Sequence, residues 1–310
     1  MLYRISIFFK SQKLKLMSIR TIILSELKHE KSFVKKIILI LLIPFKIIKV
    51  LCGKEVIIPY VELVVTTFCN LKCQGCSALM EHYKNPKHID LEDNIKSIKR
   101  LMDLGISIKS LRLLGGEPLC YPKLYELLEY LQKQDKINEV AIVTNGTMTL
   151  KDEKLINILK DNKFWFSISD YGEVSKNFNN LINQLKENNI RYVPQSSSYE
   201  WVDYGNFEKR NRNEKEYILQ YNKCTHRRNS LLNGKLFHCF RCSHATNLKF
   251  VSLIKKDYID LFDENISNKK LKKQLYKFIY KYTPYIESCK YCDCGFNLNM
   301  LSRGKQNEKK

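Results

Sequence analysis

The chain has 310 residues, with 53 Lys and Arg against 32 Asp and Glu, a formal net charge of +21, and 11 cysteines. Only 11 of the basic residues are Arg, the residue favoured for bidentate contacts with phosphates and bases, so we do not expect nucleic acid as a partner. Many cysteines are typical of small secreted disulfide proteins, but the N-terminus shows no apolar run followed by a small-residue cleavage site. We therefore expect a cytoplasmic protein whose cysteines bind metal, with room for one large domain or slightly more.

Residues 1–57 are predicted to form a basic amphipathic extension. The first 54 residues contain twelve Lys or Arg and two Glu, a net charge of +10, and an apolar run over 37–45. Nine residues are too few to span a bilayer, which needs about 20, but with flanking lysines they can lie in an anionic cytoplasmic leaflet. We therefore expect peripheral contact with the inner face of the membrane. The alternatives are a helix that covers one end of the barrel and a partner-binding tail. The flanking lysines are Lys35, Lys36, Lys46 and Lys49.

From residue 60 onward, apolar runs alternate with helical patterns. The β-branched run at 61–67 suits a strand buried on both faces, and a helix begins after Asp90, a favourable N-cap, and ends at Gly105. Repeated strand-helix units imply a parallel sheet, in which ligands bind at the carboxyl ends of the strands. Further strands are expected at about 108–114, 139–144, 164–169 and 190–194, with helices at about 122–134, 151–160 and 174–188 between them.

Three cysteines follow the first strand as Cys69, Cys73 and Cys76, with spacers of three and two residues. Thiolates on one short loop can each bind one iron of a four-iron, four-sulfur cluster, which leaves the fourth iron without a protein ligand. Polar motifs also end the next three strands. These motifs are Gly115-Gly116-Glu117-Pro118, Thr144-Asn145-Gly146, and Ser167 with Ser169 and Asp170.

The strand, the cysteine loop with this spacing and the Gly-Gly-Glu-Pro segment one unit later together resemble the radical S-adenosylmethionine (SAM) superfamily. The resemblance implies an α/β fold with a partial (β/α)6 barrel, a [4Fe-4S] cluster whose open iron binds SAM, and an electron donor such as flavodoxin or ferredoxin. Reductive cleavage of SAM then gives a 5′-deoxyadenosyl radical that abstracts hydrogen from substrate. The implied SAM contacts are Gly115, Gly116, Glu117 and Pro118 at the ammonium group, Asn145 at the ribose, and Ser167 and Ser169 by position.

Each of these positions also has a simpler interpretation. The Gly-Gly-Glu-Pro and Asn-Gly segments are compatible with ordinary turns, and a serine inside a barrel can be merely packed and hydrogen-bonded. Asp170 either contacts a polar substrate or caps the next segment. Gly75 departs from the family pattern, which commonly has an aromatic residue near adenine before the third cysteine. The resemblance still implies SAM binding. With Gly at this position, the pattern is similar to that of subfamilies that act on sugars and glycans.

A second cysteine group lies in the last third of the chain. Its two Cys-x-x-Cys pairs alone are compatible with a tetrahedral zinc site. However, Gly234-x4-Cys239, with Cys224 nine intervening residues before the Gly, resembles the start of SPASM and twitch auxiliary-cluster domains. The twitch pattern implies that Cys224, Cys239, Cys289 and Cys292 bind an auxiliary [4Fe-4S] cluster. Cys242 and Cys294 are then surplus, and Cys242 is a candidate hydrogen-atom donor to a substrate radical or a further cluster ligand.

The resemblance implies a radical SAM enzyme, an oxidoreductase or epimerase, that abstracts hydrogen from a sugar or glycan-type substrate and so oxidises or epimerises it. The substrate is expected to be a small molecule or a lipid-linked glycan. The stretch from Ile58 to Cys294 resembles uncharacterised radical SAM proteins of bacterial polysaccharide gene clusters. Cations and imidazoles near the second cysteine group suit an anionic or polyhydroxylated substrate, or else form solvated surface. A peptide-modifying enzyme and a non-catalytic, zinc-stabilised binding protein are the alternatives. The predicted division is an extension over 1–57, the barrel over 58–215, the twitch-like domain over 216–298 and a disordered basic tail over 299–310.

Overall fold

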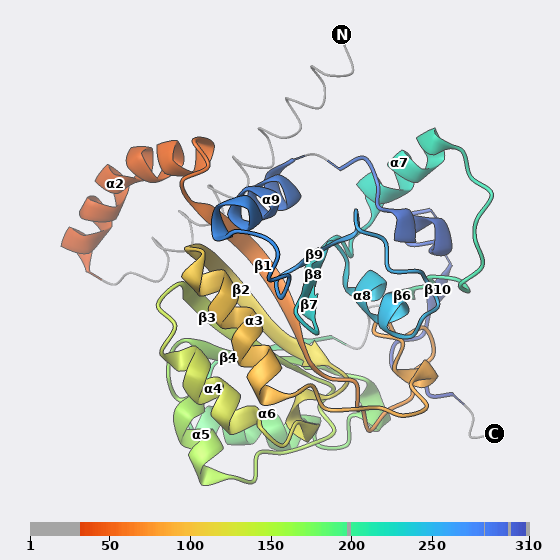
Figure 1. Cartoon of the computed structure of the whole chain (residues 1–310). Coiled ribbons are helices and arrows are strands. Elements are labelled where there is room, and N and C mark those ends of the chain that lie inside the picture. Colours follow the sequence, from red (N-terminus) through yellow and green to blue (C-terminus); the bar gives the residue numbers. More distant parts are fainter. Residues whose placement is uncertain (1–31, 197–199, 282, 297–298, 308–310) are drawn as a thin grey trace.

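The computed structural model describes residues 32–196, 200–281, 283–296 and 299–307 (Figure 1). They form an eight-stranded sheet in the order β5-β4-β3-β2-β1-β7-β8-β9 and a two-stranded sheet of β6 and β10. The strands are β1 Val56–Thr66, β2 Ile106–Gly115, β3 Ile137–Thr144, β4 Phe164–Ser169, β5 Tyr192–Gln195, β6 Trp201–Val202, β7 Asn229–Leu232, β8 Lys235–Phe237, β9 Tyr258–Asp260 and β10 Met300–Leu301. The helices are α2 Phe33–Leu51, α3 Leu91–Asp103, α4 Leu124–Gln132, α5 Glu153–Leu159, α6 Phe178–Glu187, α7 Glu214–Lys223, α8 Phe240–Asn247 and α9 Asn268–Tyr280.

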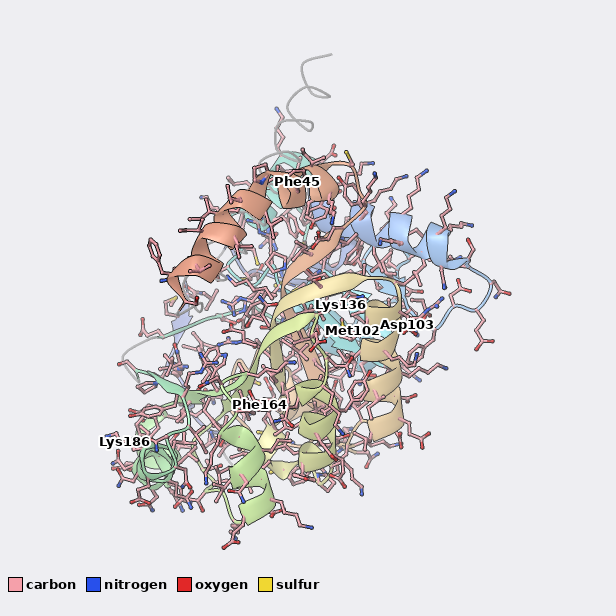
Figure 2. The ribbon with its side chains drawn as sticks, turned by 90° about the vertical axis from the view of Figure 1, so that its left-hand side faces the viewer. Phe45, Met102, Asp103, Lys136, Phe164 and Lys186 are labelled. Atoms are coloured by element: carbon pink, nitrogen blue, oxygen red, sulfur yellow. The ribbon has the colours of Figure 1, made fainter. Side chains whose placement is uncertain are left out.

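Strands β1 to β5 are parallel neighbours, and the chain passes from each to the next through α3, α4, α5 and α6 in turn. β1 is buried along most of its length, as expected for a central strand that is covered on both faces. The core between the sheet and these helices is aliphatic and aromatic, and Figure 2 shows Phe164 inside it. Burial of this apolar surface is the main force that holds the strand ends, and with them the site, in place.

Local sequence signals explain where the helices begin and end. The Asp90 carboxylate accepts a hydrogen bond from the backbone N–H of Glu92 at 2.7 Å, which caps α3 as predicted. After α3 the chain turns through Gly105, whose φ of +73° lies in the left-handed region that favours glycine. Lys136 Nζ donates to the Met102 carbonyl at 3.1 Å and so satisfies one of the last carbonyls of α3 (Figure 2).

The predicted α/β class with a partial barrel is confirmed, but the sixth parallel strand does not follow β5 around the barrel. After β5 the chain passes through β6 and α7 and returns to the opposite edge of the sheet, where β7 pairs parallel with β1. β8 and β9 then add antiparallel strands. The region that carries the second cysteine group is therefore built onto the same continuous sheet as the first cysteine loop.

The last helix, α9, closes the end of the sheet where β1 begins. The backbone N–H of Ile57 donates to Tyr280 Oη, and this hydroxyl donates to the Ile57 carbonyl, both at 2.9 Å. Val50, at the end of α2, belongs to the same core as Leu271 and Leu275 of α9. The ends of α2 and α9 therefore meet at the amino ends of the strands, away from the cysteine loop.

Helix α2 is the described part of the predicted N-terminal extension; residues 1–31 lie outside the described residues. Large apolar side chains are exposed along it, and Figure 2 shows Phe45 on its outer side. Across the ranges that the structure describes, no helix is long and apolar enough to cross a membrane. Contact of the extension with a membrane surface stays a prediction.

The predicted disordered tail over 299–310 is wrong for residues 299–307. β10 pairs with β6, and the chain beyond it makes backbone hydrogen bonds with the first cysteine loop. Basic composition suggested disorder, but backbone pairing does not depend on side-chain charge, and the cysteine loop that this segment pairs with lies more than 200 residues away in the sequence. Residues 308–310 lie outside the described residues.

Candidate active site

The first cysteine loop leaves the carboxyl end of β1 and lies beside the end of β2. Burial raises the pKa of the Cys69 and Cys76 thiols to about 12 each, and it also raises that of Cys73. The charge of Glu117 raises the pKa of Cys69 further, as do those of Cys76 and Cys73. Buried thiols of this kind become thiolates by exchanging their protons for a metal cation.

The Gly-Gly pair that ends β2 is required by close packing against this loop. Gly116 N donates to Thr66 O at 2.8 Å, and Glu117 N donates to Phe68 O at 2.9 Å. A Cβ at Gly116 would lie 1.8 Å from the carbonyl oxygen of Phe68, and Gly115, with φ of +140°, leaves no room for one either. The segment is therefore not an ordinary turn, because its glycines allow the two backbones to approach and hold the cysteine loop.

Glu117 joins this segment to the end of β3. Its Oε2 accepts the backbone N–H of Asn145 at 2.8 Å, and its Oε1 accepts that of Leu119 at 3.1 Å. The side chain is fully buried, and burial raises the pKa of this carboxyl to about 7. Each carboxylate oxygen can accept two hydrogen bonds, so Glu117 retains capacity for an ammonium ligand.

The structure brings Asn145 to the cysteine loop. Its Nδ2 donates to Asn70 Oδ1 at 2.9 Å and lies 3.8 Å from Cys69 Sγ. Ser167 and Ser169 are buried on β4, and two-residue alternation places them on the same face. Asp170 Oδ1 accepts the backbone N–H of Gly172 at 2.8 Å, which supports the capping interpretation of that residue.

All six cysteines of the second group line one pocket, which is small and partly open to solvent. Cys224 follows α7, Cys239 and Cys242 lie at the start of α8, and the others lie after Ile286. These cysteines are Cys224, Cys239, Cys242, Cys289, Cys292 and Cys294. Burial raises the pKa of the Cys239 and Cys289 thiols well above their usual range. The cavity therefore collects more thiols than one cluster needs.

The two surplus cysteines have different surroundings. Cys294 Sγ lies 3.5 Å from Cys224 Sγ, so these two thiols occupy nearly the same position in the cavity wall. Cys242 Sγ lies 2.9 Å from Ser288 Oγ, which in turn donates to Asp257 Oδ2 at 2.6 Å. Burial, together with the Asp257 charge, raises the pKa of the Cys242 thiol well above its usual range. Cys242 therefore differs from the other thiols in its contact with Ser288, and Cys294 is an alternative to Cys224 as a ligand.

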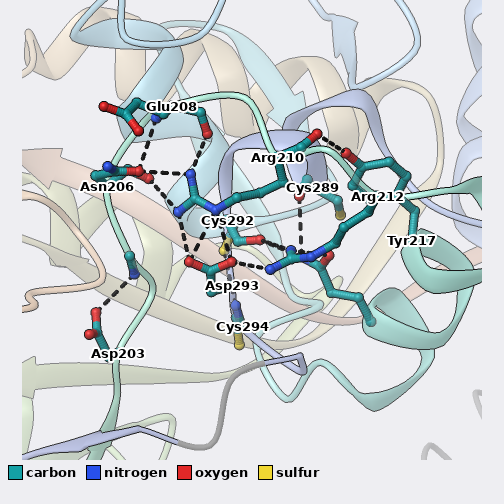
Figure 3. Close-up of polar contacts among 12 residues, drawn as sticks. Asp203, Asn206, Glu208, Arg210, Arg212, Tyr217, Cys289, Cys292, Asp293 and Cys294 are labelled. Carbon is teal, nitrogen blue, oxygen red and sulfur yellow. Dashed lines mark hydrogen bonds and ion pairs between the residues drawn. The ribbon is translucent and has the colours of Figure 1, made fainter.

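A network of ion pairs and hydrogen bonds, not predicted from the sequence, fixes the Cys289–Cys294 segment (Figure 3). Asp293 forms ion pairs with both Arg210 and Arg212, and Gln220 Nε2 donates to the Cys292 carbonyl at 2.7 Å. Burial alone would raise the pKa of Asp293, but hydrogen bonds from the two guanidinium groups outweigh it and lower this pKa. An aspartate between two cysteines was the only sequence signal for this network.

The predicted cluster of cations and imidazoles does not converge on one point. His226, Arg227 and Arg241 line the cysteine cavity. In contrast, His238 stacks on Phe278 with ring centroids 3.5 Å apart, and Arg228 pairs with Glu62. His244 is buried, and its Nδ1 bonds Tyr83 Oη at 2.8 Å. Only the first three are placed to meet a molecule in the cavity.

The three thiols on one loop, backed by a Gly-Gly segment and a buried Glu, fit the donor set of a [4Fe-4S] cluster that leaves one iron for SAM. Residues 63–169, from β1 to the end of β4, match the family model described as the Radical SAM superfamily. This part of the chain is a radical SAM domain, and proteins of the superfamily use a [4Fe-4S] cluster and SAM, whose cleavage supplies the radical chemistry. Among the described residues, no three His, Cys, Asp or Glu side chains are arranged to hold a single metal ion.

Curated relatives match the same part of the chain. One stretch is 32% identical over 98 residues to GTP 3′,8-cyclase of Clostridium perfringens (strain SM101), which covers 31% of this chain and 29% of that protein. Another is 33% identical over 92 residues to GTP 3′,8-cyclase of Clostridium acetobutylicum, covering 29% of this chain and 28% of the relative. The matched stretch thus spans less than a third of the length of either relative.

Similar solved structures extend over more of the chain. The crystal structure of BtrN in complex with AdoMet, which is SAM, and 2-DOIA has a TM-score of 0.50 at 15% identity, and covers 82% of this chain and 98% of that chain. Native anSMEcpe with bound AdoMet has a TM-score of 0.48 at 16% identity, over 77% of this chain and 84% of that chain. The likeness to BtrN establishes a shared fold.

Proposed function

We propose that this radical SAM protein abstracts hydrogen from a sugar or glycan-type substrate, leading to oxidation or epimerisation. The observation that carries the proposal is the placement of two cysteine sites on one sheet, one at the carboxyl end of β1 and one beside β7. Arg227, Arg241 and His226 line the second site. Burial lowers the pKa of His226 to about 4, so this imidazole is neutral and can both donate and accept hydrogen bonds to hydroxyl groups.

The second site has one of two roles in this proposal. With Cys224, Cys239, Cys289 and Cys292 as ligands, an auxiliary [4Fe-4S] cluster would accept the electron released when a substrate radical is oxidised. In epimerisation, the Cys242 thiol would instead donate a hydrogen atom to the substrate radical. The resulting thiyl radical is restored by one electron from the external donor and one proton, and Ser288 with Asp257 is placed to return that proton.

The test uses the full chain, reconstituted anaerobically with iron and sulfide. It is incubated with SAM, a reductant and candidate nucleotide sugars or lipid-linked glycans in D2O, and 5′-deoxyadenosine and product masses are followed. Oxidation gives a product two hydrogens lighter, whereas epimerisation gives a product with one solvent deuterium that depends on Cys242. GTP and short peptides are included as competing substrates. A product from either of these, with none from the sugars, would refute the substrate proposal.

We further infer that α2 and α9 form an anionic-membrane surface, which would place the protein at the inner face of the membrane. Along the outer side of α2, Val34, Ile38, Leu41, Phe45 and Ile48 recur at helical spacing, and each is at least half exposed. Neither α2 nor α9 contains an acidic residue. An apolar helix side bordered by cations matches the acyl boundary and headgroups of an anionic leaflet.

Helix α9 lies at the same end of the molecule as α2 in both views (Figures 1 and 2). Four exposed lysines follow one another at four-residue spacing, each worth about 1 kcal/mol near an anionic surface. They are Lys269, Lys273, Lys277 and Lys281.

Sedimentation with vesicles tests this surface. We expect the full chain to bind phosphatidylcholine vesicles only when phosphatidylglycerol is included, with binding weakened by salt. Leu41→Glu with Phe45→Glu should abolish it. Leu219→Glu, which changes an apolar side chain of α7 that is 49% exposed, is the matched control and should bind normally. A dimer that the α2 variant dissociates, without vesicle binding by the wild type, would show instead that a second copy covers α2.

A further inference from the structure

The segment Met300–Asn307 crosses the first cysteine loop. β10 anchors its start on β6, and the chain then runs antiparallel to the loop. Gln74 N donates to Lys305 O at 2.8 Å, and Asn307 N donates to Lys72 O at 2.9 Å. This backbone pairing places three side chains of the segment at the site.

The first of these side chains is Gln306, which contacts a cysteine of the loop directly. Its Oε1 accepts the backbone N–H of Lys72 at 2.8 Å, so the amide orientation is fixed by the loop itself. Its Nε2 then donates to Cys73 Sγ at 3.1 Å. A hydrogen bond to a ligating sulfur stabilises the reduced cluster, which carries more negative charge, and therefore raises the reduction potential.

Leu301 explains the unusual glycine before the third cysteine. A Cβ at Gly75 would lie 2.4 Å from Leu301 Cδ1, and Gly75 has φ of +63°, in the left-handed region. The space that an aromatic side chain at position 75 would enter is therefore already filled by Leu301. An apolar wall near the expected adenine position thus comes from the far end of the chain.

Arg303 brings a cation to the end of β4. Its Nη2 donates to Ser169 Oγ at 3.3 Å, and its Nη1 donates to the Ser196 carbonyl at 2.9 Å. Its Nε is buried and has no hydrogen-bond partner among the described residues. A buried donor without a partner is costly, and an anionic group bound beside Ser169 would satisfy it.

We propose that Met300–Asn307 is part of the SAM site: Gln306 sets the potential of the catalytic cluster, Leu301 forms an apolar wall for the adenine, and Arg303 meets the SAM carboxylate. The proposal rests on the radical SAM chemistry of the loop and is independent of the substrate. In this proposal, residues that lie more than 200 positions after the cysteine loop in the sequence act as positioning residues for SAM.

The first test measures the reduction potential of the catalytic cluster by an anaerobic redox titration followed by electron paramagnetic resonance. Gln306→Glu keeps an acceptor for Lys72 N but replaces the donor to Cys73 with a negative charge, so the potential should shift to more negative values. Lys305→Gln is the matched control in the same segment, because only its backbone carbonyl contacts the loop, and its potential should match the wild type. A Cys73→Ala variant identifies the signal of any auxiliary cluster.

The second test measures SAM binding by equilibrium dialysis of the oxidised holoenzyme, which needs no substrate. Leu301→Ala and Arg303→Gln should each raise the dissociation constant about tenfold, equivalent to about 1.4 kcal/mol. Unchanged potential in Gln306→Glu together with unchanged SAM affinity in the other two variants would overturn the proposal and leave the proposed function intact. Tighter SAM binding in Leu301→Ala would overturn it too, since the segment would then block the site. Failure of every sugar substrate would affect only the proposed function.

Discussion

Replacement of Asp293 by Asn should release the Cys289–Cys294 segment. Asp293 pairs with Arg210 and Arg212, and all three side chains are at most 16% exposed. The substitution keeps the shape but leaves two largely buried guanidinium groups without a counter-ion. Breaking a buried pair costs about 3–5 kcal/mol, and the residual exposure argues for the lower end, so we expect a loss of about 3 kcal/mol.

Anaerobic thermal unfolding and iron content would measure this loss. The Asn variant should unfold at least about 5 °C below the wild type and lose iron from the second site while the first keeps its own. Because the folded-state pKa of Asp293 is lowered, its contribution is complete above about pH 4 and is lost as the pH falls further. The Asn variant should therefore lack this acid-dependent component. Asp103→Asn breaks an exposed pair with Lys99 and serves as the control without measurable effect.

An Asp293→Asn variant that unfolded at the same temperature as Asp103→Asn and retained all of its iron would show that these ion pairs do not hold the Cys289–Cys294 segment. A double-mutant cycle with Arg210→Gln sharpens the result. Asp293 and Arg210 should show a coupling energy, because the Arg variant alone already removes one of the two ion pairs. Additive losses would mean that the network contributes packing rather than charge pairing.

Three further predictions concern other parts of the molecule. Gly116→Ala should prevent the first site from binding iron, because its Cβ would meet the backbone oxygen of Phe68; normal iron content would contradict the packing argument. Burial raises the pKa of Glu62 to about 7, so the free energy of unfolding of the wild type should fall as the pH rises from about 4.5 to 7. In chemical unfolding experiments, Glu62→Gln should remove at most about 3 kcal/mol of this pH-dependent fall. A variant with the same pH profile as the wild type would contradict this prediction. Cys294→Ser should keep the iron of the second site and Cys224→Ser should lose it, as measured by iron analysis; the reverse would assign Cys294 as the ligand.

The sequence allowed the parallel strands, and therefore the first site, to be predicted. Since parallel strands end at the same edge, Cys69 and Asn145 were expected together, and the structure places Asn145 Nδ2 3.8 Å from Cys69 Sγ. The contact of Gln306 with Cys73 was not predictable, because nothing in a local pattern encodes pairing across 233 residues. Gly75 was the one available signal, since a missing aromatic implies that another side chain fills its place.

The second site was predictable in composition but not in detail. Cysteine spacing identified the six thiols, but only the tertiary structure reveals that Cys224 Sγ and Cys294 Sγ lie 3.5 Å apart and that Cys242 contacts Ser288. The position of β7 beside β1 was missed for a related reason: strand order depends on how the chain crosses the sheet, and local periodicity is the same on either edge.

The direction of β1 limits which substrates a membrane-bound form could use. β1 has eleven residues, so it spans up to about 35 Å between the end of α2 and the first cysteine loop. With α2 on a bilayer, the radical would form that far above the lipid headgroups and face away from them. A sugar attached directly to a lipid phosphate could not reach it. The substrate would then be a freely diffusing molecule or the outer end of a glycan several units long, and the electron donor would approach from the same open side.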